Sequence, residues 1–272
     1  MQQRIEAGRR AVLQQKELVH RELGKARSEW KHDNSRVTAV DLAVAKDVFA
    51  ILEGAFSGDD FFSEEMDPQQ DTLRREAWYS WVLDPIDGTN NYAAGLSACS
   101  ISLALLRDGQ PVYGYLYDIS RSRLMEGGPG FGVLDGGEPV MANEGEPDSS
   151  TTIGVHSPRD LSLAPLVGGL AARFKIRALG SSALHLGYVG AGLLDGAVDV
   201  NVKVWDIAAA HALCLGGGAE IRYLTGPIFP LDAFDLHMGS IHYCAGGAPV
   251  CDALEAVMGE HLGVCRRSQT DS

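Results

Sequence analysis

Apolar and polar residues alternate at helical spacing along the start of the chain. Residues 4–29 carry apolar side chains three and four positions apart among many charges, which predicts one amphipathic helix. A polar break at residues 31–35 separates it from a second predicted helix, which runs from residue 37 to Gly54 or Gly58. The next two apolar stretches, residues 61–65 and 78–84, are rich in aromatic and branched residues and predict strands.

The rest of the chain shows two successive patterns of apolar and polar residues. Residues 97–140 alternate short apolar runs with Gly and Asp turns, which predicts an antiparallel meander. After it, helical and strand patterns alternate. The predicted helices are 161–174, 181–192, 207–218 and 248–262, the predicted strands are 151–156, 175–180, 198–202 and 241–246, and residues 223–237 are irregular. We therefore predict an α+β lobe over residues 1–145 and an α/β lobe over residues 146–272.

The charge and cysteine content of the chain disfavour several classes of protein. The 272 residues include 23 Lys and Arg against 36 Asp and Glu, a formal net charge of −13, which disfavours general binding to nucleic acid. Charges interrupt the apolar runs at the N-terminus, so neither an export signal nor a membrane span is expected. The five cysteines are scattered without a CxxC pair, which favours a reducing cytoplasm over disulfides or a zinc site.

The strongest chemical signal is the sequence DPIDGTNN, residues 84–91. A predicted strand ends at Asp84, and the chain then turns to present Asp87 beside residues that favour a helix start. Carboxylates attract a cation, whereas the free N–H groups of a helix N-terminus attract an anion. Mg²⁺ that bridges to a phosphate would satisfy both. The triplet Asp-Gly-Thr alone is more often a capped turn.

Two other acidic sequences are candidate partners of this segment. Glu64 and Glu65 lie at the end of the preceding predicted strand, and Asp206 in the sequence WDIAA opens a predicted helix. Taken alone, the glutamates are typical of an exposed polar pair and Asp206 of an N-cap. Their occurrence together with Asp84 and Asp87 favours a common metal site.

These motifs, in this order, resemble the inositol monophosphatase family of magnesium-dependent, lithium-sensitive phosphatases. The resemblance extends from about Val37 to Gly218. It implies a layered αβαβα sandwich of the sugar-phosphatase type, with two lobes in one compact unit, the metal site between them, and assembly as a homodimer.

The resemblance also assigns roles to residues of this sequence. It implies two or three Mg²⁺ ions held by Glu64, Asp84, the carbonyl of Ile86, Asp87 and Asp206. It implies that Glu65 and Thr89 orient the attacking water and that Asp41 supports Thr89. The substrate contacts that it implies are Asp87, Gly88, Thr89, Gly180, Ser181, Ser182 and Asp199.

The predicted activity is hydrolysis of a small polyol or sugar phosphate, with inositol monophosphate as the favoured substrate. Histidinol phosphate and fructose 1,6-bisphosphate are alternative substrates for the same site. An interaction protein in ribosomal RNA transcription is an alternative of another class, since some bacterial relatives have that role. Two weaker features are predicted to be structural: Gly127–Gly132 as a hairpin turn, and His211 as a packing or surface residue.

Overall fold

The computed structural model describes residues 1–25, 28–30, 36–66, 72–156 and 160–262. Its larger sheet has seven strands in the order β10-β9-β8-β7-β6-β5-β3, in which only β3 and β5 are parallel. These strands are β3 (Asp60–Ser63), β5 (Tyr79–Asp87), β6 (Ser100–Arg107), β7 (Gln110–Asp118), β8 (Arg123–Gly128), β9 (Gly132–Asp135) and β10 (Glu138–Val140). The meander predicted from the turns is thereby confirmed.

The second sheet has five strands in the order β12-β11-β13-β16-β14. It is parallel across β12, β11 and β13, and antiparallel at β16 and β14. Its strands are β11 (Thr152–Val155), β12 (Lys175–Arg177), β13 (Gly196–Val202), β14 (Glu220–Tyr223) and β16 (Ile241–Gly246). The described residues also form two short antiparallel strand pairs. These are β1 (Ser28–Trp30) with β2 (Arg36–Thr38), and β4 (Leu73–Arg74) with β15 (Ala233–Phe234).

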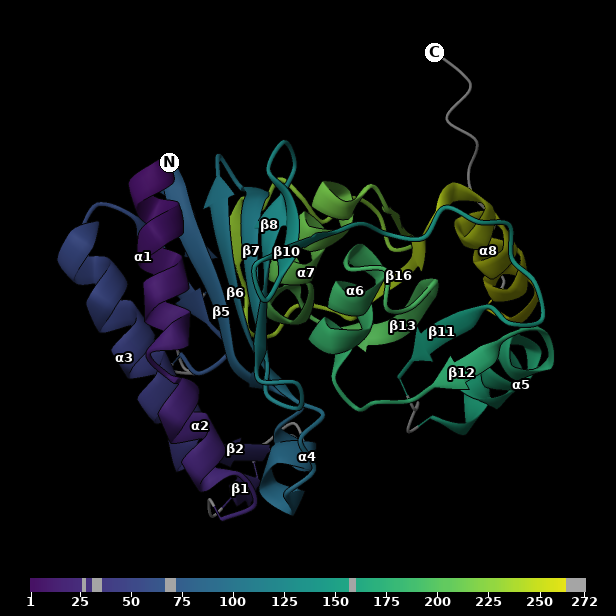
Figure 1. The fold of residues 1–272 in the computed structure, drawn as a ribbon, viewed down its shortest axis with the longest axis horizontal. Helices are drawn as coiled ribbons and strands as arrows, with labels where there is room; N and C mark the ends of the chain where they lie inside the picture. Colours follow the sequence, from purple (N-terminus) through teal and green to yellow (C-terminus); the bar gives the residue numbers. More distant parts are fainter. Residues whose placement is uncertain (26–27, 31–35, 67–71, 157–159, 263–272) are drawn as a thin grey trace.

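Helices form three layers around the two sheets, so the chain has the predicted αβαβα sandwich (Figure 1). The outer helices on the first sheet are α1 (Gln2–Leu13), α2 (Lys16–Glu22) and α3 (Ala39–Ala55), and those on the second sheet are α5 (Ala164–Arg173) and α8 (Ala248–Leu262). Between the sheets lie α6 (Ser182–Gly190) and α7 (Val204–Gly217). A short helix, α4 (Thr89–Ala94), follows β5.

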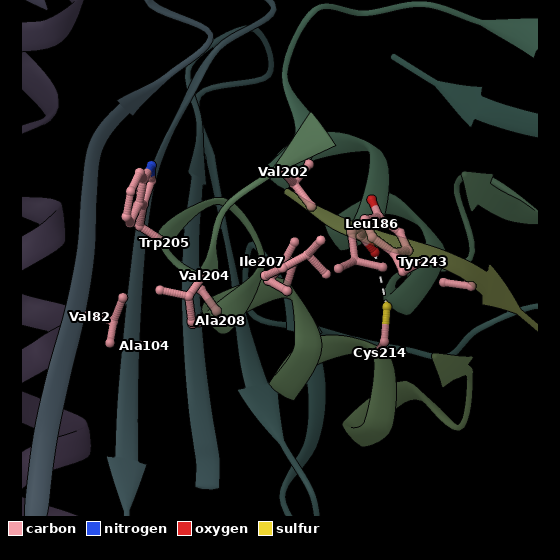
Figure 2. Packing of buried hydrophobic residues seen from close by; sticks show 14 of the residues in the cluster. Val82, Ala104, Leu186, Val202, Val204, Trp205, Ile207, Ala208, Cys214 and Tyr243 are labelled. Atoms are coloured by element: carbon pink, nitrogen blue, oxygen red, sulfur yellow. Dashed lines mark hydrogen bonds between the residues drawn. The ribbon is translucent and has the colours of Figure 1, made fainter. Parts of the chain in front are cut away.

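The middle layer joins both halves of the chain into one hydrophobic core. Val82 and Ala104 of the first sheet face Val204 and Ala208 of α7, with Leu186 and Tyr243 on the far side of that helix (Figure 2). All six belong to the same buried cluster. Helix α7 is therefore apolar on nearly its whole surface, as a helix between two sheets must be.

The N-terminal helix is the clearest error of the sequence-based prediction. The single helix expected over residues 4–29 is two helices, and residues 28–30 form strand β1. Helix α2 ends because Leu23, with ψ of 123°, leaves the helical conformation and Gly24 has φ of +70°. A Cβ on Gly24 would lie 2.8 Å from the Cα of Gly95, so the turn also permits a close approach.

Other helices and strands begin or end a few residues away from their predicted boundaries. Strand β3 ends at Ser63, so Glu64 and Glu65 lie in the turn that follows it rather than in the strand. The irregular stretch 223–237 contains β15. The last helix is confirmed at Ala248–Leu262, and Gly127–Gly132 connects β8 to β9 as a hairpin. Among the described residues, no helix combines the length and apolar character needed to cross a membrane.

Candidate active site

Strand β5 carries two of the predicted acids through a bulge. The strand does not end at Asp84 as predicted; it continues through Pro85 to Asp87, and its pairing with β6 shifts register between Asp84 and Asp87. Proline cannot donate a hydrogen bond to the sheet, so it is tolerated where the pairing is already interrupted. Asp84 has the same parity as Val82, which places its side chain on the inter-sheet face.

Two aspartates of β5 meet a third from α7 there. One carboxylate oxygen each from Asp84, Asp87 and Asp206 lies within 4.8 Å of the others. Asp84 and Asp87 are buried, whereas Asp206 is partly exposed. Asp206 is the third residue of α7 rather than its N-cap, and its carboxylate accepts a hydrogen bond from the Lys203 N–H at 2.6 Å.

Asp87 is anchored to the N-terminus of α6. Its Oδ2 accepts a hydrogen bond from the Ser181 hydroxyl and another from the Ala183 N–H, the latter at 2.9 Å. Ser181 caps α6 through the Leu184 N–H at 3.2 Å. One serine therefore fixes both a helix end and an acid of the cluster.

The grouping raises the pKa of each acid. Burial raises the pKa of Asp84 well above its ordinary range, and neighbouring carboxylates, Glu64 first, raise it further. Burial raises the pKa of Asp87 to about 6 despite its two hydrogen bonds. Burial and then Asp87 and Glu64 raise the pKa of Asp206 well above its usual value. Each shift reflects the cost of gathering negative charge away from water.

The donor set fits a hard divalent cation. Asp84 Oδ1 is buried without a hydrogen-bond partner among the described residues. Burying an ionised oxygen without a hydrogen-bond partner costs free energy unless a proton or a cation binds to it. Oxygen ligands are those that Mg²⁺ prefers. The Glu64 carboxylate lies outside the group of three but close enough to act on each of them.

Thr89 and Asp41 are in contact, as the resemblance implied. The Thr89 hydroxyl lies 2.9 Å from the Ile86 carbonyl oxygen and 3.4 Å from Asp41 Oδ1. Asp41 is the third residue of α3, and its Oδ2 accepts hydrogen bonds from the Thr38 N–H at 2.8 Å and the Thr38 hydroxyl at 2.5 Å. Asp41 is thus held by a capping box, with its other oxygen directed at Thr89.

The approach of the two halves is close at Gly88. Gly88 caps α4 with φ of +87°, and a Cβ there would meet the Ala98 and Gly180 carbonyl oxygens at 3.1 and 3.2 Å. Asn91 connects α4 to the second half of the chain. Its Nδ2 donates hydrogen bonds to the carbonyl oxygens of Ala98 and Leu179, at 2.7 Å each. No pattern in the sequence indicates this role of Asn91.

The predicted substrate residues Ser182 and Asp199 lie in contact near the N-terminus of α6. The Ser182 hydroxyl donates to Asp199 Oδ2 at 2.9 Å. His156, directly after β11, lies beside this pair, with Nδ1 at 4.0 Å from Asp199 Oδ2. Sequence reasoning missed His156 because no local pattern connects it to the acids.

Glu65 borders a cavity beside α3. With Ser63 and Met66 it lines a cavity of about 330 Å³ against α3, whose walls include Leu42 and Phe49. Its N–H donates to the Ser63 hydroxyl at 3.2 Å. Glu65 is therefore close in sequence to the cluster while lining a cavity on the α3 side.

Known proteins resemble this chain over most of its length. The model of the inositol monophosphatase family matches residues 1–256. Inositol-1-monophosphatase ImpA of Mycolicibacterium smegmatis is 31% identical over 219 residues, which are 75% of this chain and 75% of that protein. Nus factor SuhB of Xylella fastidiosa is 33% identical over 185 residues, 65% of this chain and 66% of that protein.

Solved structures share the fold. The extragenic suppressor protein SuhB of Bartonella henselae superposes with a TM-score of 0.81 at 21% identity, covering 93% of this chain and 97% of that one. An IMPase/NADP phosphatase complexed with Mg²⁺ and phosphate gives a TM-score of 0.76 at 21% identity, with 90% of each chain covered.

The fold, the acidic cluster and these relatives define the class of protein: an enzyme that hydrolyses phosphate monoesters. The chain belongs to the inositol monophosphatase family.

Proposed function

We propose that this enzyme is a Mg²⁺-dependent phosphatase whose substrate is inositol monophosphate. The observation that carries the proposal is the convergence of Asp84, Asp87 and Asp206 within 4.8 Å beside the N-terminus of a helix. A bound cation would stabilise such a group in its ionised form, and phosphate is an anion that a cation and a helix N-terminus can bind jointly.

The residues that would hold two or three Mg²⁺ ions are Glu64, Asp84, the carbonyl of Ile86, Asp87 and Asp206. When bound, Mg²⁺ supplies an activated water for attack on phosphorus and positive charge for the departing oxygen. Asp84 would be among the ligands, which its unpartnered Oδ1 supports.

Thr89 and Glu65 are proposed to orient the attacking water. The Thr89 hydroxyl has a single proton and two acceptors within reach, the Ile86 carbonyl and Asp41. While it donates to either one, its lone pairs remain available to accept a hydrogen bond from water. Asp41, held by Thr38, would keep the Thr89 hydroxyl in that orientation.

The substrate is proposed to lie along the cleft from α4 to α6. The Gly88 and Thr89 N–H groups would bind phosphate oxygens, because the first N–H groups of a helix lack partners within it. Asp87, Gly180, Ser181, Ser182 and Asp199 would line the side that receives the polyol. Ser182 and Asp199 form a hydrogen-bonded pair there, which supports a polar leaving group.

Several finer properties belong to the same proposal. We infer that the enzyme acts in the cytoplasm as a homodimer and that lithium inhibits it. We also infer two lobes, residues 1–145 and 146–272, with the cleft between them. The close approach of Gly88 to Gly180 supports that placement of the cleft.

A phosphate-release panel tests the function. The purified protein is incubated with myo-inositol 1-phosphate, fructose 1,6-bisphosphate, histidinol phosphate and 3′-phosphoadenosine 5′-phosphate, with Mg²⁺, with Mg²⁺ and Li⁺, and with EDTA. We expect the highest kcat/KM with inositol phosphate, inhibition by Li⁺ and no release in EDTA. A higher kcat/KM with another ester would replace the substrate assignment.

The Nus factor at 33% identity favours a second candidate, a role in ribosomal RNA transcription. Pull-down of RNA polymerase by the wild type and by an Asp84→Asn variant distinguishes the two. Equal capture by both would support an interaction role independent of catalysis. Absence of capture by either removes this candidate.

A further inference from the structure

The acid expected to receive the substrate's hydroxyls is shielded from solvent. The side chain of Asp199 is 1% exposed, whereas that of His156, whose ring lies against it, is 36% exposed. A residue with almost no accessible surface has little area to offer a ligand that arrives from solvent. Of these two groups, the imidazole is the accessible one.

Both carboxylate oxygens of Asp199 also accept hydrogen bonds from other groups of the protein. Oδ2 accepts a hydrogen bond from the Ser182 hydroxyl at 2.9 Å, and Oδ1 accepts one from the Asn201 N–H at 3.0 Å. Both oxygens are therefore oriented by neighbours before any substrate binds. This arrangement is typical of a residue that fixes another side chain.

The two nitrogens of His156 differ in their surroundings. Nδ1 is buried, has no hydrogen-bond partner among the described residues, and lies 4.0 Å from Asp199 Oδ2. That distance exceeds a hydrogen bond of ~3 Å, but it leaves the Asp199 carboxylate as an acidic group beside Nδ1. The exposed surface of the side chain therefore belongs to atoms other than Nδ1. His156 is also close enough to Asp87 to act on it electrostatically, which places it near the acidic cluster.

We propose that His156, and not Asp199, contacts the hydroxyl groups of the polyol leaving group, and that Asp199 acts through His156. An acid beside Nδ1 favours the tautomer with the proton on Nδ1. Nε2 is then an acceptor, and a hydroxyl of the substrate donates to it. His156 is thus a specificity-determining residue and Asp199 a positioning residue. The inference rests on the proposed phosphatase function.

Two esters separate this role from a structural one. Myo-inositol 1-phosphate carries hydroxyls on its leaving group, whereas para-nitrophenyl phosphate carries none. For His156→Ala we expect the KM for inositol phosphate to rise about threefold to tenfold, the loss of one hydrogen bond. We expect kcat for inositol phosphate, and KM for the nitrophenyl ester, to stay within about twofold. His156→Gln, which returns an acceptor oxygen near the place of Nε2, recovers part of the affinity.

A double-mutant cycle tests the part played by Asp199. If Asp199 acts through His156, Asp199→Asn raises the KM for inositol phosphate in the wild type but has no further effect in the His156→Ala background. An equal additional loss in that background would show direct contact between Asp199 and the substrate and overturn the proposal. His261→Ala, in the exposed last turn of α8, is the matched control.

The possible results distinguish a failure of this inference from a failure of the proposed function. Turnover of inositol phosphate with an unchanged KM in a folded His156→Ala variant overturns the inference and leaves the phosphatase function intact. Failure of the wild type to hydrolyse either ester in Mg²⁺ overturns the proposed function and this inference with it. A thermal melt of each variant confirms that the fold is retained.

Discussion

At the scale of single residues, the site consists of acids that repel one another. Asp84, Asp87 and Asp206 each have a raised pKa because burial and neighbouring carboxylates disfavour their charged forms. Hydrogen bonds from Ser181, Ala183 and Lys203 fix two of them, while Asp84 Oδ1 has no partner among the described residues. Bound positive charge would therefore stabilise the ionised form of these acids.

Asp84→Asn tests that conclusion. The amide keeps the shape of the side chain and removes its charge, so we expect phosphate release to fall at least about a hundredfold while the protein remains folded. The Tm of the metal-free variant is expected to equal or exceed that of the wild type, because one repelling charge is gone. Mg²⁺ should raise the Tm of the wild type and not that of the variant.

Asp47→Asn is the matched control, since Asp47 lies on the exposed face of α3. Its turnover and Mg²⁺ response should equal those of the wild type. Turnover by Asp84→Asn within about tenfold of the wild type would contradict the metal assignment.

The raised pKa of Asp87 predicts the pH dependence of metal binding. With a pKa of about 6 in the folded protein, against 3.8 for an ordinary aspartate, this carboxyl is mostly protonated at pH 5 and ionised at pH 7.5. Mg²⁺ must displace the proton, so its Kd should be at least about tenfold weaker at pH 5. Titration calorimetry at the two pH values measures this. Equal affinities would show that Asp87 is not a ligand.

At the scale of elements, the site depends on where helices begin. Strand β5 leads through its bulge into α4, and the N-termini of α6 and α7 hold Asp87 and Asp206. Local sequence predicted these helices because capping residues and Gly88 are recognisable. It could not predict the bulge at Pro85, which depends on the partner strand, nor the contact of Asn91 with Leu179 from the other half of the chain.

Asn91→Ala should loosen this arrangement. The variant leaves two carbonyl oxygens, those of Ala98 and Leu179, without the donor that both now share. We expect a loss of about 2 kcal/mol in the free energy of unfolding, measured in urea, and a lower kcat. Asn90→Ala, its exposed neighbour, should change neither quantity. Equal stability of the two variants would mean that Asn91 does not join the halves.

At the scale of the whole molecule, α7 holds the two sheets together. It packs on the first sheet so closely that a Cβ on Gly114 would lie 2.1 Å from the Ala209 carbonyl oxygen. The same helix carries Asp206, so the packing of the core also positions the site. Compactness and catalysis thus depend on one element.

Gly114→Ala should therefore destabilise the protein by about 1–3 kcal/mol, as overpacking of a core does. Gly54→Ala is the matched control, because nothing lies within 4 Å of its Cβ position in α3. That variant should be neutral or more stable by about 0.5–1 kcal/mol. Urea unfolding of both proteins measures the contrast, and similar midpoints would contradict the close packing of α7.

The sequence and the structure agree where the determinants are local. Motif residues 84–91, the meander and the last helix were predictable because spacing and turn chemistry specify them. The break between α1 and α2 was not, because helical periodicity continues across residues 14 and 15. The end of α2 was not either, because the turn at Gly24 depends on contact with Gly95. His156 was missed for the same reason, since its place beside Asp199 arises only when β11 and β13 pair.

The central claim is that three converging aspartates make this enzyme depend on Mg²⁺ for hydrolysis of inositol monophosphate. The most direct test is the rate of phosphate release from myo-inositol 1-phosphate as Mg²⁺ is added to chelator-treated enzyme. We predict no release without metal and a saturable rise with Mg²⁺. An undiminished rate in excess EDTA would contradict the account.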